Sequence, residues 1–375
     1  MPALTKAQKK LAQAAEDSFN HTYAVHFGAE RWQQSLYPAL TAPTRYAALV
    51  NRFAVADLAR VFSQEQAAKL QAIVFPGTEE SHDSIPLKSY QWDVSEAEVT
   101  FPPPQSDSSS GLMTHWNLDA ASLLAVHILD PKPGDKIFDL CAAPGGKSVA
   151  LSQCLRPENY DGTSSPALGG GCLHSNEVNA GRNKRLASNL RSYLPDALFQ
   201  SGEVKVVKLD GTEPFSVQTL PLGPGGYDKV LLDAPCSSER HVVHAHARAR
   251  QGGRVADEMA SWRSGQSKKM AKTQVALLMT ALRAVRVGGR VLYATCSLSD
   301  DENDGVLEKG MELVQKERKK SGVRWDFVVR SGDLATRGLG DWAEPTKYGW
   351  LVLPDHPDGK KWGPLFFALL EKVEA

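Results

Sequence analysis

Two cysteines, each placed just after a short apolar run, are the residues of this chain best suited to covalent chemistry. Cys236 lies in VLLDAPCSS (230–238), and Cys296 lies in VLYATCSLS (291–299). Such runs are typical of buried parallel strands, and the small hydroxyl residues behind them are typical of turns. Ligands of an open α/β sheet bind at the carboxyl ends of its strands, so we expect both thiols to face one pocket. Because no CxxC pattern or ligand cluster accompanies them, the pair indicates covalent catalysis rather than metal binding.

Acidic residues stand at the ends of successive predicted strands. A carboxylate at the end of the second strand can accept hydrogen bonds from a ribose. Four carboxylates at one edge would repel a pyrophosphate but attract the sulfonium and ammonium groups of S-adenosylmethionine. We therefore expect S-adenosylmethionine, rather than NAD, as the cofactor. The four residues are Asp139, Glu177, Asp210 and Asp233.

A glycine-containing turn follows the first predicted strand. Its residues are Ala142, Ala143, Pro144, Gly145 and Gly146. Glycines let backbone N–H groups approach a ligand at the start of a helix. The turn differs from the GxGxxG pattern of dinucleotide-binding proteins, which again disfavours NAD. Taken alone, this glycine-containing turn is compatible with a plain tight turn. Together with the acidic residues at the strand ends, it favours a cofactor site.

The elements that must position these residues alternate between strand and helix. Predicted helices lie at 147–155 and 179–194. This alternation indicates an α/β fold with a parallel sheet and helices on both faces. The strands are predicted within 136–146, 172–178, 203–211, 227–236 and 288–296, with two terminal strands at 326–332 and 364–373.

The chain before these elements has a different character. Residues 4–75 are predicted to be helical, and the Pro/Ser-rich segment FPPPQSDSSSG (101–111) is predicted to be a linker. We therefore expect an N-terminal helical region with its linker (1–111) and a catalytic domain (112–375) that begins near a helix at 118–129. The Gly/Ser-rich loop at 156–171 is interpreted as an insertion.

Composition excludes several classes of protein. The chain has 375 residues, 42% hydrophobic and 23% charged, which is ordinary for a soluble globular protein. No apolar run approaches the roughly 20 residues that a membrane span needs. Five scattered cysteines argue against a disulfide framework and for a reducing compartment. The N-terminus lacks the apolar core of a secretory signal and is a poor organellar presequence.

Basic residues concentrate after Cys236. Residues 240–272 hold eight Lys/Arg against two acidic residues, although the whole chain has a net charge of zero. Because this segment leaves the predicted pocket, its charge suits contacts with the phosphates of RNA; the alternative is a solvated helix face. The histidines among them lack Cys or acidic partners, so we expect no metal site. The candidate RNA contacts are Arg240, His241, Arg248, Arg250, Arg263 and Lys268.

Three motifs together resemble the RNA (cytosine-5) methyltransferases of the Nop/Sun family. They are DLCAAPGGKS (139–148), DAPCSS (233–238) and YATCSLSDDEN (293–303). The resemblance spans about 118–373 and implies a Rossmann-like S-adenosylmethionine-dependent methyltransferase. The segments HTYAVHFGAERW (21–32), RHVVH (240–244) and GPLFFALLEK (363–372) look like the mitochondrial ribosomal-RNA branch of that family.

The resemblance also implies roles for single residues. Cys296 would be the nucleophile that attacks cytosine, Cys236 would promote release, and Asp233 would stabilise the adduct between cofactor and base. A thiolate is the reactive form, so we expect positive surroundings to lower the pKa of Cys296. Cys154 and Cys172 are expected in the core. The implied cofactor contacts are Cys141, Ala142, Pro144, Gly145, Gly146, Lys147, Glu177, Arg182, Asp210, Gly211 and Asp233.

The implied activity is the formation of 5-methylcytosine in mitochondrial small-subunit ribosomal RNA. Two alternatives stay open: an organellar transfer-RNA cytosine-5 methyltransferase, and a catalytically idle RNA-assembly scaffold. The resemblance also implies a mitochondrial location, with the cytoplasm or nucleus as the alternative, and a helical-repeat protein partner of the transcription-termination-factor type.

Overall fold

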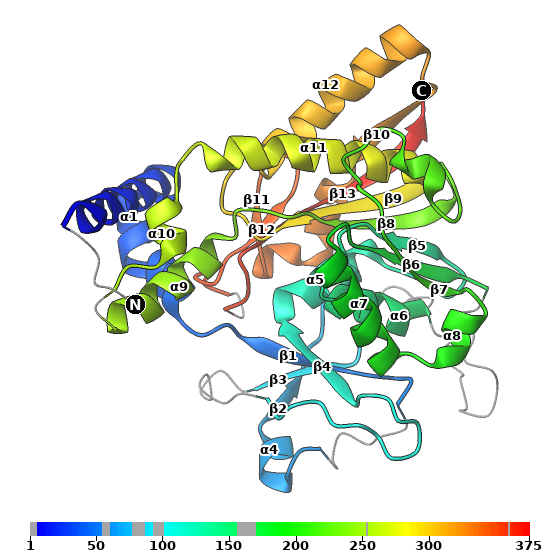
Figure 1. The fold of residues 1–375 in the computed structure, drawn as a ribbon, viewed down its shortest axis with the longest axis horizontal. Helices are drawn as coiled ribbons and strands as arrows, with labels where there is room; N and C mark the ends of the chain where they lie inside the picture. Colours follow the sequence, from blue (N-terminus) through cyan, green and yellow to red (C-terminus); the bar gives the residue numbers. More distant parts are fainter. Residues whose placement is uncertain are drawn as a thin grey trace.

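A mixed nine-stranded sheet forms the centre of the protein (Figure 1). The computed structural model describes residues 6–54, 61–76, 87–92, 101–155, 170–252, 254–358 and 361–375, and the predicted insertion lies almost wholly outside these ranges. Five parallel strands run in the order β7-β6-β5-β8-β9. They are β5 (Lys136–Asp139), β6 (Cys172–Asn176), β7 (Val204–Val207), β8 (Tyr227–Asp233) and β9 (Val285–Thr295).

Antiparallel strands extend the sheet beyond β9. The long strand β13 (Leu365–Glu374) pairs with β9 on one side and with both β10 (Trp325–Val329) and β12 (Trp350–Val352) on the other. The two-residue strand β11 (Glu344–Pro345) pairs with β12. The predicted terminal strands are therefore confirmed; β13 runs against the parallel strands, whereas β10, antiparallel to β13, runs in their direction.

Helices cover both faces of the sheet, as the alternation predicts (Figure 1). Along β8, Leu231 joins one apolar cluster, whereas Val230 and Leu232 join the other, because successive side chains of a strand point to opposite faces. The first cluster lies under α5 (Ala120–Leu129), α6 (Gly146–Leu155) and α7 (Ala180–Tyr193); the second lies under α9 (Glu239–Gln251), α11 (Gln266–Ala284) and α12 (Asp304–Ser321). Short helices are α8 (Asp196–Gln200) and α10 (Asp257–Ser261).

The prediction that residues 4–75 are helical is correct for most of 6–41 and for 64–68, and wrong for 46–50 and 70–72; residues 4–5 and 55–60 lie outside the described ranges. Helices α1 (Lys6–Phe27), α2 (Ala29–Arg31) and α3 (Tyr37–Thr41) form, with a π-helical turn between the last two, and α4 (Gln64–Ala68) follows later. Between α3 and α4 the apolar run YAALV forms β1 (Tyr46–Val50). Its burial between two strands outweighs the helical tendency of its alanines.

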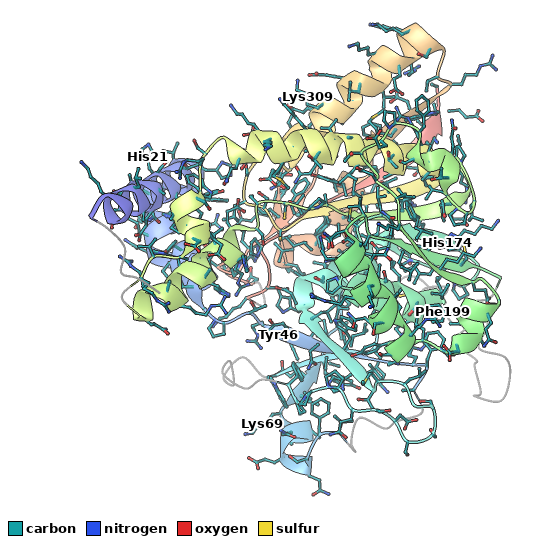
Figure 2. The ribbon with its side chains drawn as sticks, viewed as in Figure 1. His21, Tyr46, Lys69, His174, Phe199 and Lys309 are labelled. Atoms are coloured by element: carbon teal, nitrogen blue, oxygen red, sulfur yellow. The ribbon has the colours of Figure 1, made fainter. Side chains whose placement is uncertain are left out.

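A small antiparallel sheet contains this strand, in the order β2-β3-β1-β4. Figure 2 shows Tyr46 of β1 and Lys69, next to β2, at the lower end of the molecule. Because β4 takes the first residues of the predicted helix at 118–129, that helix begins at Ala120, capped by the side chain of Asp119. The domain boundary at residue 111 stays a prediction, although β4 beyond it pairs with β1 before it. The remaining strands are β2 (Leu70–Ala72), β3 (Ser89–Trp92) and β4 (His115–Asp119).

An aromatic cluster fastens α1 to the main body. Phe19 and Tyr23 of α1 lie 5.2 Å and 6.2 Å, ring centre to ring centre, from Trp262 after α10. Tyr23 also stacks on Trp32 at 5.3 Å. These rings belong to the same apolar cluster as residues of β8 and β9. Within the described ranges, no helix is both long and apolar enough to cross a bilayer.

We predict that Phe19→Ala destabilises the protein by about 3–5 kcal/mol, because the ring is fully buried and its removal leaves a cavity. The measurement is the free energy of unfolding in urea. The matched control is Val25→Ala on the same helix, where the side chain is 72% exposed and little change is expected. Equal effects of the two substitutions would contradict this packing of α1.

Candidate active site

The two cysteines meet at the carboxyl edge of the sheet. Strand β8 ends at Asp233, three residues before Cys236, and β9 ends at Thr295, one residue before Cys296. Since these parallel strands are neighbours, their ends bring the two sulfurs within 3.0 Å of each other. Both cysteines line one pocket, which confirms the expectation that they face the same cavity.

The hydrogen bond between the sulfurs shifts the two thiols in opposite directions. The Cys236 thiol, as donor, lowers the pKa of Cys296 and outweighs the effect of burial, and Ser238, whose Oγ lies 3.3 Å away, lowers it further. The same bond, together with burial, raises the pKa of Cys236. The expected direction for Cys296 is therefore correct, but its main cause is different. Hydrogen bonds with the Cys236 thiol and the Ser238 hydroxyl contribute more than positive surroundings, and the nearby Asp233 and Glu239 act against them. The positive charge near Cys296 is that of Lys147, which interacts with it electrostatically.

Asp233 is held by a lysine from the cofactor turn. Lys147 Nζ lies 2.7 Å from Asp233 Oδ2 and donates a second bond to Ser122 Oγ at 3.0 Å. Burial lowers the pKa of Lys147, but its pairing with Asp233 outweighs burial and leaves the pKa raised. The ion pair links the start of α6 to the end of β8. It fixes Asp233, which lines the pocket, next to the cysteines.

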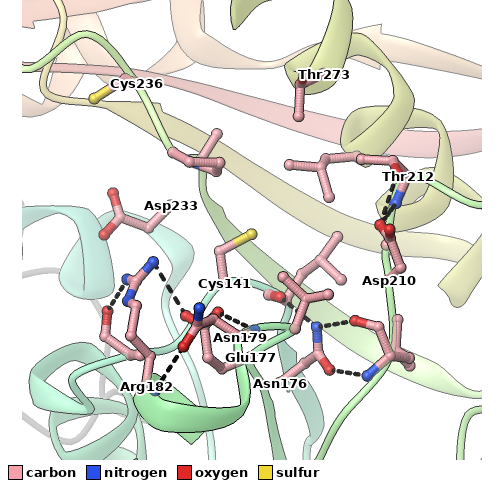
Figure 3. Close-up of a pocket in the computed structure, with 18 of the residues that line it drawn as sticks. Cys141, Asn176, Glu177, Asn179, Arg182, Asp210, Thr212, Asp233, Cys236 and Thr273 are labelled. Carbon is pink, nitrogen blue, oxygen red and sulfur yellow. Dashed lines mark hydrogen bonds and ion pairs between the residues drawn. The ribbon is translucent and has the colours of Figure 1, made fainter.

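The pocket has a volume of about 520 Å³, within the range of small-molecule sites. Figure 3 shows Glu177, Asn179 and Arg182 grouped on one side and Asp210 with Thr212 on another. Of the predicted cofactor contacts, the structure brings Cys141, Glu177, Arg182, Asp210, Gly211 and Asp233 to the pocket. The others, Ala142, Pro144, Gly145, Gly146 and Lys147, form the turn and the start of α6 and do not line this cavity.

The two carboxylates far from the thiols are fixed by local bonds. Glu177 Oε1 accepts the backbone N–H of Asn179 at 2.8 Å, and its Oε2 lies 3.3 Å from Arg182 Nη1. Asp210 Oδ1 accepts both the N–H and the hydroxyl of Thr212, at 2.9 and 2.6 Å. Both carboxylates line the pocket and are held in place by these bonds, which Figure 3 marks as dashed lines.

Asp139, expected as a fourth pocket carboxylate, lies inside the protein instead. It is fully buried and accepts a hydrogen bond from Ser148 Oγ at 2.6 Å. Burial raises its pKa to about 7, because removing a carboxylate from water disfavours its charged form. Asp139 therefore braces the first turn of α6, and three carboxylates, not four, face the cavity.

Glycines shape the turn itself. Gly145 has a φ of +120°, a conformation that other residues rarely adopt. A Cβ at Gly146 would lie 2.8 Å from the indole nitrogen of Trp116. The turn therefore needs both glycines for its path and its packing, which is a structural reason for this part of the motif.

Several pocket residues escape sequence reasoning. Asn176 binds three backbone groups, donating to the carbonyls of Leu140 and Leu209 and accepting from the N–H of Leu209. It thus ties the ends of β5 and β7 to β6, and its only signal is a polar residue next to Glu177. Leu277 and Thr273 reach the pocket from α11, which lies between β8 and β9 in sequence and away from both strand ends, and they have no local signal.

The predicted RNA contacts divide into exposed and internal residues. Arg240 is a correction: it is 8% exposed, and its guanidinium donates to the carbonyls of Ala42, Pro43 and Gly363, so it ties the N-terminal segment to the catalytic domain. The other predicted contacts, His241, Arg248, Arg250, Arg263 and Lys268, are exposed. Arg250 is paired with Glu16 at 3.2 Å.

The histidines after Cys236 point to different partners. His244 Nε2 bonds the carbonyl of Ala42 at 3.0 Å, and His246 is buried with Nε2 3.3 Å from Glu16. In the part of the chain that the structure describes, no group of three or more His, Cys, Asp and Glu residues is arranged to hold a metal ion.

The strand order and the pocket at the carboxyl edge define an α/β methyltransferase fold. Two solved structures from Pyrococcus horikoshii share it: NSun6 with SFG (17% identity, TM-score 0.60, 96% of this chain and 98% of that one) and a methyltransferase homologue (19%, TM-score 0.54, 98% and 99%). The family model "16S rRNA methyltransferase RsmB/F" matches residues 126–327. The chain belongs to this family, whose methyl donor is S-adenosylmethionine.

Relatives of known function cover most of the chain. The mouse 5-cytosine rRNA methyltransferase NSUN4 is 32% identical over 83% of this chain and 77% of its own. The zebrafish mitochondrial tRNA (cytosine(34)-C(5))-methyltransferase is 31% identical over 99% of this chain and 90% of its own. Three pocket carboxylates and the apolar side chains of Leu209 and Leu277 fit a cationic adenosine derivative such as S-adenosylmethionine.

We predict that Cys236→Ala raises the pKa of Cys296, because the strongest donor to the Cys296 sulfur is lost. Thiolate forms as pH rises through that pKa, so the alkylation of Cys296 by iodoacetamide should need a higher pH in the variant. Peptide mass spectrometry measures the midpoint, and Cys172→Ala, a distant buried cysteine, serves as the control. An unchanged midpoint in Cys236→Ala would refute the role given to the sulfur–sulfur bond.

Proposed function

We propose that this protein forms 5-methylcytosine in ribosomal RNA through a covalent adduct between Cys296 and cytosine, with S-adenosylmethionine as methyl donor. The observation that carries the proposal is the pair of thiols, 3.0 Å apart with opposite pKa shifts, in one pocket with Asp233. A catalytically idle scaffold would have no use for this pair.

The adduct makes a poor nucleophile reactive. The Cys296 thiolate adds to carbon 6 of cytosine, and the electron pair displaced from the ring makes carbon 5 nucleophilic. When bound, S-adenosylmethionine supplies an electrophilic methyl group to that carbon. The adduct takes up a proton at N3 from solvent, and Asp233, held by Lys147, offers a carboxylate that accepts a hydrogen bond from that N3–H. The target base has to leave its stack to reach the pocket.

Release of the product reverses the first step. Water takes the carbon 5 proton, N3 returns its proton to solvent, and the carbon 6–sulfur bond breaks, which restores the aromatic base and frees Cys296 as a thiolate. The hydrogen bond from the Cys236 thiol stabilises that departing thiolate. The same bond therefore favours both the attack and the departure of Cys296, and Cys236 promotes release without itself bonding to the base.

We predict that Cys296→Ala abolishes methylation, whereas Cys236→Ala accumulates a covalent protein–RNA adduct because the departing thiolate loses its donor. Denaturing gels detect the adduct, and mass spectrometry of digested RNA quantifies 5-methylcytosine. Cys172→Ala should behave as the unchanged protein does. A methylating Cys296→Ala enzyme would refute the assignment of the nucleophile.

RNA is proposed to lie along the helices that leave the pocket. Thr273 and Leu277 of α11 line the cavity, and within the two turns before them the same helix presents three exposed lysines. Arg248 lies on α9, which begins just after the pocket residue Ser238. A strand whose target base enters the pocket would thus pass close to these cations. The three lysines, called the α11 lysines, are Lys268, Lys269 and Lys272.

We predict that changing the α11 lysines to Gln weakens RNA binding and lowers the slope of log affinity against log salt by about 2, since each lost phosphate contact removes about 0.7. Fluorescence anisotropy at several salt concentrations measures the slope. The matched control changes Lys316, Lys319 and Lys320 of α12, whose residues do not line the pocket. A slope that falls equally in both variants would place the RNA elsewhere.

A transfer RNA is the second candidate substrate. It is favoured by the zebrafish transfer-RNA enzyme, which matches nearly the whole chain. Bisulfite sequencing of ribosomal and transfer RNA from cells that carry the intact protein or Cys296→Ala separates the two. Loss of methylation at one ribosomal cytosine supports the first proposal, loss at a transfer-RNA cytosine supports the second, and no change supports the scaffold.

We also infer a mitochondrial location and a helical-repeat protein partner of the termination-factor type. The location is supported by relatives whose names include "mitochondrial". A chain of zero net charge exerts little long-range attraction on RNA, so a partner that adds basic surface would increase affinity. Fractionation of the source cells and co-purification with the tagged protein test the two inferences separately.

A further inference from the structure

A fully buried carboxylate lies between the two cysteine loops and takes no part in the proposed chemistry. Glu239 stands in the first turn of α9, three residues after Cys236. Its Oε2 accepts the backbone N–H of Leu298, two residues after Cys296, at 2.9 Å. Its Oε1 accepts the hydroxyl of Ser237, the residue after Cys236. One carboxyl group therefore binds the loop of each cysteine.

The Ser297 hydroxyl also donates to Glu239 Oε1, at 3.5 Å, and the N-terminal helix supplies a further donor. Tyr23 of α1 donates its hydroxyl to Glu239 Oε1 at 2.8 Å across 216 residues of sequence, and the bond is buried. Burial raises the pKa of Glu239, and its hydrogen-bond donors, including Ser237, Leu298 and Tyr23, act to lower it. A buried carboxylate that loses a hydrogen-bond donor loses free energy of stabilisation. The Tyr23 hydroxyl therefore helps to keep Glu239 ionised and bound to both cysteine loops.

A second buried carboxylate braces the same loops from the other side. Glu302 Oε2 accepts the N–H of Ser237 at 3.0 Å and the side-chain amide of Gln274 at 2.9 Å. Gln274 also bonds the carbonyl of Pro235, the residue before Cys236. Ser237 and Ser297, the residues after the two cysteines, also share a direct hydroxyl bond of 2.9 Å. Since Glu302 holds mainly the Cys236 loop, the carboxylate link from that loop to Leu298 is made by Glu239.

We propose that Tyr23 and Glu239 are positioning residues that hold the sulfurs of Cys236 and Cys296 at hydrogen-bonding distance, which makes α1 a working part of the active site. The inference deepens the proposed function and rests on its two-thiol mechanism. Tyr23 and Glu239 touch neither pocket nor substrate; they act on the distance between the sulfurs. A change of a few tenths of an ångström there weakens the bond on which the thiolate depends.

The test substitutes Tyr23→Phe, which removes the hydroxyl and keeps the buried ring. Asp233 and the paired Lys147 keep their charges in this variant. Loss of the Tyr23 donor raises the pKa of Glu239, and a less charged Glu239 would lower the pKa of Cys296, so an upward shift reports the distance between the sulfurs. In the free protein, iodoacetamide should label Cys296 about 3- to 10-fold more slowly at neutral pH, with the midpoint of its pH profile moved upward. With RNA, kcat should fall by a similar factor while KM for S-adenosylmethionine stays the same.

Two controls separate positioning from general packing. Tyr37→Phe removes a hydroxyl from the same aromatic cluster without touching Glu239, and it should leave the pH profile unchanged. In a Cys236→Ala background, Tyr23→Phe should have no further effect, because it acts through the Cys236 sulfur. An unchanged profile in Tyr23→Phe, an equal shift in Tyr37→Phe, or a full additional shift in the double variant would each overturn the proposal.

The labelling readout does not depend on methylation. If Tyr23→Phe shifts the thiol profile in a protein that methylates no RNA, the positioning inference stands and the proposed function fails. If methylation is present and the thiol profile does not move, the positioning inference fails alone.

Discussion

The active site depends on one hydrogen bond between two sulfurs, 3.0 Å apart at the ends of adjacent strands. A thiol is a weak nucleophile until it ionises, and a buried thiol ionises with difficulty. Here the hydrogen bond from the Cys236 thiol to the neighbouring sulfur lowers the pKa of Cys296 and raises the pKa of Cys236. A neutral thiol can lower the pKa of Cys296 inside a site lined by carboxylates. A cation in the same place would pair with Asp233, as Lys147 does.

The parallel sheet determines which groups can meet at this edge. Because β6, β7, β8 and β9 all end on the same side, Glu177, Asp210, Asp233 and the thiols share one cavity. The carboxylates suit a cationic methyl donor, and the thiols lie at the other end of the cavity beside Asp233, as Figure 3 shows for Cys236. The spacing of the strands therefore separates the cofactor side of the cavity from the nucleophile. The loops after β8 and β9 determine the distance between the two sulfurs.

The sequence predicts the residues whose position follows from a strand end, and it fails where tertiary contacts decide. Cys236, Cys296, Glu177 and Asp210 were predictable because a predicted strand ends at or near each of them. Asp139 also ends a strand, but Ser148 from the next helix turns it inward. Arg240 looks like an RNA contact until the carbonyls of residues 42, 43 and 363 surround it. Strand β1 and the link from Tyr23 to Glu239 join distant parts of the chain, for which no local pattern exists.

The central claim is that Cys296 attacks and Cys236 assists, and it is tested most directly by trapping the adduct. RNA that contains 5-fluorocytosine has no proton to lose from carbon 5, so the enzyme should remain bonded to carbon 6 of the base. Digestion and peptide mass spectrometry then identify the attached cysteine. Attachment at Cys296, with Cys236 free in the same sample, is the result that our account predicts. Attachment at Cys236, or equal attachment at both, would contradict it.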